Sequence, residues 1–134
     1  MANVIDVAAA VIMKDGLVML ARRAMGEHLG QKWEFPGGKI EPGETPRECL
    51  QRELKEEFDI NTKAGKFLGE SLYHYPDKSI RLLAYEVVWL DGDLILRVHD
   101  KIDWVRVEEL LEKDMAAADI PIAQILYVKP PEHA

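Results

Sequence analysis

The sequence predicts an α/β fold of the α+β type, in which helices cover a mixed β-sheet. Runs rich in Val, Ile and Leu alternate with segments of helical spacing, and clusters of Gly, Pro and Asp separate them. The 134 residues are enough to bury a core, and no linker, repeat or low-complexity segment divides them. We therefore expect one domain over residues 1–134.

The first elements are predicted to be a hairpin, a loop and a short strand. Residues 4–13 and 17–21 are rich in Val, Ile, Leu and Ala, and the Asp-Gly pair between them is a strong hairpin signal. Residues 24–32 are predicted to form a loop. A strand at residues 33–35 then ends at a Pro-Gly-Gly turn.

The next element is a helix with a well-marked start. Thr45 is a good N-cap, Pro46 falls at the first helical position, and Glu48 completes a capping box. An apolar stripe follows at i, i+4 and i+8, formed by Leu50, Leu54 and Phe58.

The second half of the chain predicts a long hairpin and two further helices. Residues 65–75 and 79–90 have strand character and are joined by a Pro-Asp-Lys turn. A short strand at residues 102–105 follows an Asp-Gly turn. Residues 107–113 and 121–128 have helical spacing.

Charge and cysteine content exclude several classes of protein. A net charge of -7 argues against a protein that binds a nucleic acid polymer. The single Cys49 excludes an internal disulfide and a Cys-based zinc site, and we interpret it as a small core residue rather than a reactive thiol. Asp6 interrupts the N-terminal apolar run and residues 7–13 are too short to span a membrane, so we expect a cytoplasmic protein.

The predicted helix carries a cluster of glutamates. Glu53, Glu56 and Glu57 stand at i, i+3 and i+4, which places them on one side of the helix. Their mutual repulsion is costly unless a cation neutralises it. Oxygen ligands of this kind suit a hard divalent ion such as Mg²⁺ or Mn²⁺.

Residues 38–60 resemble the Nudix box, G-x5-E-x7-R-E-U-x-E-E-x-G-U, in which U is aliphatic. The matching positions are Gly38, Glu44, Arg52, Glu53, Leu54, Glu56, Glu57 and Ile60. Asp59 stands where the family has Gly, at a helix end where Asp tolerates a left-handed turn at a cost of about 1 kcal/mol. Matches outside the box resemble the MutT-like branch of the family, which implies a Nudix-type α/β/α sandwich.

The resemblance implies a mechanism of metal-assisted hydrolysis. Glu53, Glu56 and Glu57 would hold the divalent ions, and the carbonyl of Gly37 or Gly38 would add a ligand. Glu53 is the expected base toward water, with Glu44 as the alternative. The products would be a nucleoside monophosphate and pyrophosphate.

Further residues have two interpretations each. Arg52 either orients the glutamates or forms an ordinary surface ion pair. Lys39 and Arg23 are candidates for phosphate contacts or plain surface residues. Many relatives carry another acidic ligand at the position of Val98, so either Asp100 takes that role or the box alone holds the metal.

The base of the nucleotide would contact Asp119 and an aromatic ring. Asp119 either touches the edge of the base or caps the helix that follows, and an ionised Asp would favour a base with an exocyclic amine. A protonated Asp119 would also donate to an oxidised guanine. Phe35 and Trp33 are candidates for stacking on the base or for core packing.

These observations predict a Mg²⁺- or Mn²⁺-dependent pyrophosphohydrolase of a small-molecule nucleoside or deoxynucleoside triphosphate, including a damaged or modified one. One alternative is a Nudix hydrolase of ADP-ribose or a dinucleoside polyphosphate. The other is a Nudix module that binds a nucleotide without cleaving it, although three intact glutamates argue against this. We expect a monomer or homodimer.

Overall fold

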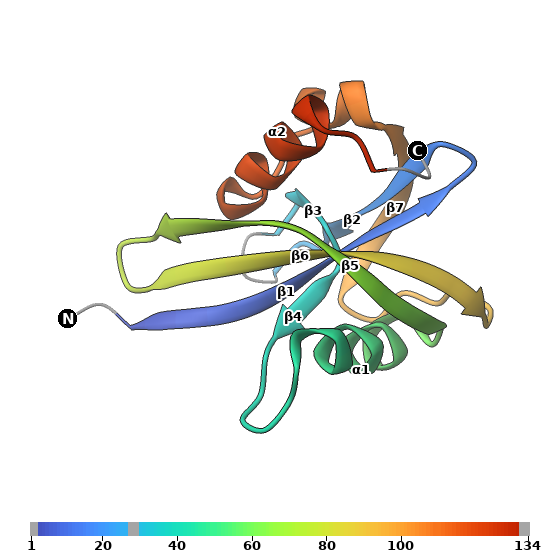
Figure 1. Cartoon of the computed structure of the whole chain (residues 1–134), viewed down its shortest axis with the longest axis horizontal. Helices are drawn as coiled ribbons and strands as arrows, with labels where there is room; N and C mark the ends of the chain where they lie inside the picture. Colours follow the sequence, from blue (N-terminus) through green and yellow to red (C-terminus); the bar gives the residue numbers. More distant parts are fainter. Residues whose placement is uncertain (1–2, 27–29, 132–134) are drawn as a thin grey trace.

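The computed structural model describes residues 3–26 and 30–131 and places a mixed sheet between two layers of helix (Figure 1). The strands are β1 (Val4–Lys14), β2 (Leu17–Arg23), β3 (Trp33–Glu34), β4 (Gly37–Lys39), β5 (Asn61–His74), β6 (Ser79–Asp91) and β7 (His99–Arg106). The α-helices are α1 (Pro46–Phe58) and α2 (Ile120–Val128), and short 3₁₀ helices span Val107–Glu112 and Ala117–Asp119. The predicted α/β/α sandwich is confirmed.

The sheet is mixed because β1 has neighbours of both directions. The main strand order is β3-β2-β1-β6-β5, with β1 parallel to β6 and antiparallel to β2. β4 also pairs with β1, and β7 pairs with β2. These pairings bring the strand before α1 to the centre of the sheet, where the candidate site lies.

Alternation along β1 divides the core into two clusters on opposite faces of the sheet. Ala8, Ala10 and Ile12 pack in the cluster that contains the apolar side of α1. Ala9 and Val11 pack in the cluster that contains α2. The central strand is therefore buried on both faces, which fixes the position of α1 against the sheet.

The start of α1 is as predicted. Thr45 accepts a hydrogen bond from the Glu48 backbone N–H, and the Glu48 side chain accepts one from the Thr45 N–H. The departure at Asp59 causes no irregularity, because Asp59 ends the helix in the left-handed conformation that the family's Gly would adopt. Its carboxylate lies 3.3 Å from Lys55 Nζ.

Several predicted boundaries are wrong. Gly37 and Gly38 belong to strand β4 rather than to a turn. Strand β5 begins at Asn61 and strand β7 at His99, in each case before the predicted start. The predicted loop at residues 24–32 includes residues 27–29, which lie outside the described residues.

Close approach between strands explains the error at β4. A β carbon on Gly37 would lie 1.9 Å from the carbonyl oxygen of Ala8, so only glycine permits this pairing. In the part of the chain that the structure describes, no helix is long and apolar enough to cross a membrane.

Candidate active site

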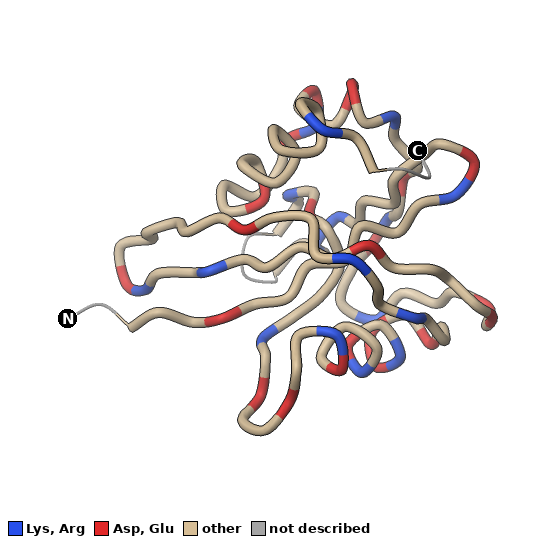
Figure 2. The backbone as a smooth tube through the Cα atoms, viewed as in Figure 1, with Lys and Arg blue, Asp and Glu red and all other residues tan. Residues whose placement is uncertain are grey.

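Helix α1 and the segment before it carry acidic and basic residues close together (Figure 2). The guanidinium of Arg52 organises this region. Its Nε and Nη2 donate to the two carboxylate oxygens of Glu44 at 2.6 and 2.9 Å. Its Nη1 donates to Glu53 at 2.7 Å and to Glu56 at 3.2 Å. The interpretation of Arg52 as an ordinary surface pair is wrong, because its side chain is only 24% exposed and holds three carboxylates.

The two candidate bases have different environments. The hydrogen bonds from Arg52, together with the backbone N–H of Glu41, lower the pKa of Glu44 to about 2. A carboxylate with so low a pKa is a weak proton acceptor. Glu53 shares only one oxygen with Arg52, at Oε1. Arg52 therefore engages both oxygens of Glu44 but only one oxygen of Glu53.

Glu57 is the least satisfied carboxyl group of the site. Its Oε2 is buried and has no hydrogen-bond partner among the described residues. Burial, and next the neighbouring charge of Glu53, raise the pKa of Glu57 above its usual range. A partly buried carboxyl group with one unpaired oxygen, beside a second carboxyl group, fits a divalent cation, which would supply the missing positive charge.

The glutamates do not meet at one point in this structure. Glu56 is 59% exposed, whereas Glu53 and Glu57 lie partly buried. Within the described residues, no group of three His, Cys, Asp or Glu side chains is close enough together to hold a metal ion. The predicted ligand set therefore stays a prediction.

Gly38 and Cys49 lie next to this cluster of charged side chains. Gly38 lies against Glu53, where a β carbon would be 2.4 Å from the Glu53 carboxyl carbon. The Gly38 carbonyl accepts a weak hydrogen bond from Cys49 Sγ at 3.4 Å. Cys49 is fully buried and burial raises the pKa of its thiol to about 12, so the prediction of an unreactive core cysteine is confirmed.

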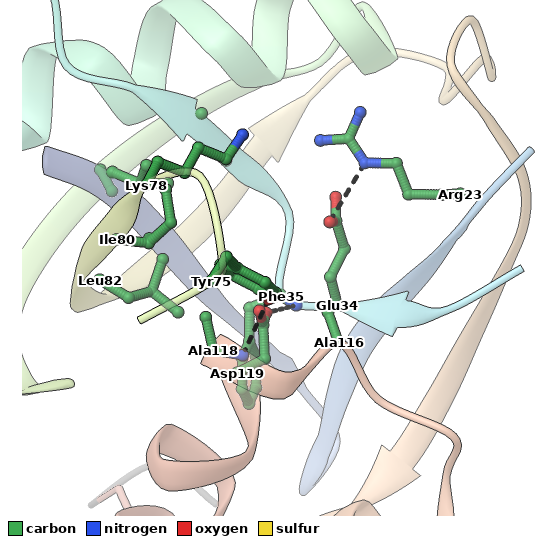
Figure 3. Close-up of a pocket in the computed structure, with 14 residues that line it drawn as sticks. Arg23, Glu34, Phe35, Tyr75, Lys78, Ile80, Leu82, Ala116, Ala118 and Asp119 are labelled. Atoms are coloured by element: carbon green, nitrogen blue, oxygen red, sulfur yellow. Dashed lines mark hydrogen bonds and ion pairs between the residues drawn. The ribbon is translucent and has the colours of Figure 1, made fainter. Parts of the chain in front are cut away.

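A cavity adjoins the carboxylate cluster (Figure 3). It has a volume of about 600 Å³, which includes the part open to solvent. The polar and aromatic residues that line it are Arg23, Glu34, Phe35, Tyr75, Lys78 and Asp119. Gly37 and Gly38 also line this cavity, so it is continuous with the start of the glutamate region.

Asp119 lies in the wall of this cavity and is almost fully buried. Its Oδ2 accepts a hydrogen bond from the Phe35 backbone N–H at 2.9 Å. The capping interpretation is wrong, because the Asp119 side chain makes no capping hydrogen bond to α2. Burial, and next the charge of Glu34, raise the pKa of Asp119 well above its usual range, which shifts this carboxyl group toward its protonated form.

The two aromatic candidates, Phe35 and Trp33, lie in different positions relative to the cavity. Phe35 lines the cavity and is also part of the core cluster on the α2 side of the sheet. Trp33 packs against the same cluster outside the cavity, with the Lys113 ammonium 4.6 Å from its ring centroid. Lys39 is exposed and is not among the described residues that line the cavity, so its predicted phosphate contact stays untested.

The Asp100 carboxylate is engaged by neighbouring side chains in this structure. Both of its oxygens accept hydrogen bonds from Arg22, at 2.9 and 3.0 Å, and Oδ2 also accepts one from Gln31. These contacts lower the pKa of Asp100. The choice between Asp100 and the box alone as the source of metal ligands stays a prediction.

Sequence analysis missed a buried contact between Glu34, which lines the cavity, and His99, which lies outside its lining. Glu34 accepts a hydrogen bond from Arg23 Nε at 3.2 Å and lies 2.8 Å from His99 Nε2. The only signal in the sequence was a charged residue within the apolar strand at residues 33–35.

The candidate site consists of a carboxylate-bearing helix beside a cavity, and both are held by a mixed sheet between two helical layers. A family model described as the NUDIX domain matches residues 3–125. The chain therefore belongs to the Nudix hydrolase family, in its MutT-like group.

Curated relatives match over most of their length. The CTP pyrophosphohydrolase of Escherichia coli (strain K12) is 36% identical over 122 residues, which cover 91% of this chain and 90% of the relative. The 8-oxo-dGTP diphosphatase of Proteus vulgaris is 42% identical over 91 residues, which cover 67% and 81%.

Solved structures show the same fold. The solution structure of the E. coli ORF135 protein has a TM-score of 0.84 and 34% identity, covering 98% of this chain and 96% of that one. The crystal structure of the MutT protein from Methanosarcina mazei Go1 has a TM-score of 0.81 and 25% identity, covering 92% and 91%.

Proposed function

We propose that the protein hydrolyses a nucleoside or deoxynucleoside triphosphate to the monophosphate and pyrophosphate, with Mg²⁺ or Mn²⁺ as cofactor. The observation that carries the proposal is the position of Glu57. This buried carboxyl group lacks a partner for Oε2 among the described residues and lies close enough to Arg23 and Glu34 for their charges to affect its pKa. A group suited to a hard cation therefore adjoins a cavity suited to a nucleotide.

The proposed cation ligands are Glu53, Glu56 and Glu57, with the carbonyl of Gly37 or Gly38 as a further candidate. When bound, the ion neutralises the phosphate charge and assists ionisation of the attacking water. The residues fit this role because Glu53 and Glu57 are partly buried carboxyl groups that lie beside one another. We propose that the catalytic and binding residues all belong to one domain over residues 1–134.

The chain's own residues would move one proton. Arg52 holds Oε1 of Glu53, and we propose that this carboxylate also contacts the attacking water molecule. Glu53 accepts a proton from this water as its oxygen forms a bond to phosphorus. The bond from phosphorus to the bridging oxygen breaks at the same time, and pyrophosphate leaves with that electron pair. General base catalysis of this kind contributes about 10²- to 10⁴-fold to the rate.

The cavity would bind the rest of the nucleotide. Figure 3 shows the side chains of Arg23 and Lys78 extending from different elements, and both line the cavity. Their charges suit the phosphate groups. Phe35 is the candidate for stacking on the base, because it lines the cavity and Trp33 does not.

The protonation state of Asp119 affects which nucleobase the cavity can bind. Its Oδ2 accepts from Phe35, so the proton of the neutral acid would reside on Oδ1 and be donated to the base. A donor beside an acceptor matches the edge of cytosine, where N3 adjoins the amine, and the edge of guanine, where O6 adjoins N1–H. The expectation that Asp119 selects only amine-bearing bases therefore loses its basis.

We propose a cytosine nucleotide as the first candidate substrate. The relative named as a CTP pyrophosphohydrolase aligns with 91% of this chain, whereas the relatives whose names include 8-oxo-dGTP diphosphatase align with 67–89%. The second candidate is an oxidised guanine nucleotide, because the same edge of Asp119 would serve it.

The test is pyrophosphate release from a panel of nucleotides in the presence of Mg²⁺. The panel holds the normal ribo- and deoxynucleoside triphosphates, 5-methyl-dCTP, 8-oxo-dGTP, ADP-ribose and a dinucleoside polyphosphate. We expect the fastest release from a cytosine triphosphate. Fastest release from 8-oxo-dGTP would select the second candidate. Monophosphates formed only from ADP-ribose or the dinucleotide would contradict the substrate class, and binding without turnover would contradict catalysis.

A further inference from the structure

We propose that His99 is a positioning residue, which holds the Glu34 carboxylate so that Glu34 in turn orients Arg23 across the cavity. The proposal rests on the proposed function in one respect, namely that the cavity binds a phosphate-bearing substrate. It assigns a role to a strand β7 residue that lies outside the Nudix box and outside the predicted ligand loop position at Val98.

The geometry links three residues from three strands. His99 Nε2 lies 2.8 Å from Glu34 Oε2, and Arg23 Nε donates to Glu34 Oε1 at 3.2 Å. The two oxygens of Glu34 are thus held by two different donors, which fixes the plane of the carboxylate. Since Arg23 contacts Glu34 through Nε, the two terminal nitrogens of its guanidinium lie on the side away from Glu34 (Figure 3).

The pair is shielded from water. The His99 side chain is fully buried and that of Glu34 is 11% exposed. Charge-assisted hydrogen bonds are stronger in such surroundings than at a surface, and an unpaired carboxylate oxygen there is costly. Without the imidazole, Glu34 Oε2 would lose this partner, and the carboxylate would turn toward solvent or toward Arg23.

The surroundings of His99 also define its tautomer. Nδ1 is buried and has no hydrogen-bond partner among the described residues. An unpaired lone pair at Nδ1 costs less than an unpaired N–H that also carries a charge. Because a carboxylate oxygen only accepts, we assign a proton to Nε2, which donates to Glu34 Oε2.

A purely structural role for His99 is the competing explanation. The imidazole stacks on Phe58, with ring centroids 5.1 Å apart and an interplanar angle of 17°. Phe58 is the last residue of α1 and follows Glu57 directly. Loss of the ring would therefore affect packing as well as the hydrogen bond, and the experiment has to separate the two.

The variants His99→Gln and His99→Met form a matched pair. Both lose the aromatic stack and have similar length, but only Gln retains a donor near the position of Nε2. We expect His99→Met to raise KM about tenfold with kcat within about threefold, the size expected for one lost charge-assisted hydrogen bond. His99→Gln should restore KM to within about threefold of the native value. Equal KM values for the two variants would overturn the proposal.

A double-mutant cycle tests whether His99 acts through Glu34. Glu34→Met removes the carboxylate and keeps the side-chain length. In that background, His99→Met should leave KM unchanged, because there is nothing left to position. Fully additive effects on KM would overturn the proposal and leave His99 with a packing role. Thermal unfolding of each variant identifies any loss of folded protein, and Glu34→Met and His99→Gln keep the test valid if His99→Met does not fold.

If the native protein hydrolyses no triphosphate, the proposed function is contradicted. The role of His99 can still be tested by two other measurements. The imidazole nitrogen resonances of His99 should show the proton on Nε2, and a proton on Nδ1 alone would overturn the pairing. Calorimetry with inorganic pyrophosphate then replaces KM. Weaker binding by His99→Met than by His99→Gln would support the positioning role, and equal binding would contradict it.

Discussion

Gly38 lies so close to Glu53 that a β carbon at position 38 would force the Glu53 carboxyl group to move. A β carbon there would be 2.4 Å from the carboxyl carbon of Glu53 and 2.6 and 2.8 Å from its two oxygens. Gly38 is held in place by strand β4, where it pairs with Ala8. The strand therefore sets the position of the candidate base from one side, while Arg52 holds it from the other.

The substitution Gly38→Ala should displace Glu53 and lower kcat. Since a displacement of about 1 Å at a reacting group costs about 10²-fold, we expect a loss of that order. Gly65→Ala is the matched control, because a β carbon there would meet nothing closer than the Glu86 carbonyl oxygen at 3.8 Å. Steady-state pyrophosphate release gives the measurement. Equal kcat values for the two variants would show that the close contact has no catalytic consequence.

The substitution Glu53→Gln removes the proposed base while keeping the size of the side chain. We expect kcat to fall by about 10²- to 10⁴-fold, the usual contribution of a general base. Glu108→Gln on the exposed 3₁₀ helix is the control for a lost negative charge. Circular dichroism should show that both variants are folded. A near-native rate for Glu53→Gln would remove this residue from catalysis.

The substitution Arg52→Lys keeps the charge at position 52 but loses the planar fork. A lysine cannot hold Glu44 through two parallel hydrogen bonds and Glu53 through a third at the same time. We expect activity to fall about 10- to 100-fold, as for other residues that orient metal ligands. The Mg²⁺ concentration needed for half-maximal rate should also rise. An unchanged Mg²⁺ titration would mean that Arg52 does not orient the ligands.

Cation binding should be visible without substrate. Mg²⁺ or Mn²⁺ would replace the proton on Glu57 and raise the midpoint of thermal unfolding. By mass action, the free energy of unfolding should rise by about 2.7 kcal/mol when the ion concentration is 100 times Kd. Glu57→Gln should unfold at a higher temperature than the native protein without metal, since it lacks the unpartnered carboxyl group, and should gain less from Mg²⁺. KCl at equal ionic strength is the control, and an equal gain from Mg²⁺ in both proteins would contradict a role for Glu57.

Local sequence patterns were sufficient for α1 and its residues. The capping box fixed the first turn and the spacing i, i+3 and i+4 placed the glutamates on one side, because both depend on residues within one or two turns. Strand β4 was missed because two consecutive glycines also predict a turn. Its pairing with β1 depends on contact with Ala8, which is distant in sequence.

The cavity wall could not be predicted for the same reason. Glu34 and His99 are 65 positions apart, and no spacing rule connects them. The protonation of Asp119 depends on burial beneath Phe35 and on the charge of Glu34, so the residue type alone indicated an ionised acceptor. Sequence therefore located the chemistry of α1 but not the polar partners that surround the proposed substrate.

The substitution Asp119→Asn tests that protonation through stability. Burial raises the pKa of Asp119 in the folded protein, whereas the unfolded chain ionises near the ordinary value of 3.8. The stability contributed by the neutral acid is therefore complete below that value and is lost as the pH rises toward the folded pKa. Asparagine does not titrate and its carbonyl still accepts the Phe35 N–H.

We therefore expect the unfolding temperature of Asp119→Asn, relative to the native protein, to increase progressively from about pH 4 to about pH 8. Scanning calorimetry without metal gives the measurement, with Asp114→Asn at an exposed position as the control. Substrate preference should change little at neutral pH, because a neutral acid and an amide both present a donor and an acceptor. A constant difference across this range, together with a shift toward guanine nucleotides, would mean that Asp119 is ionised.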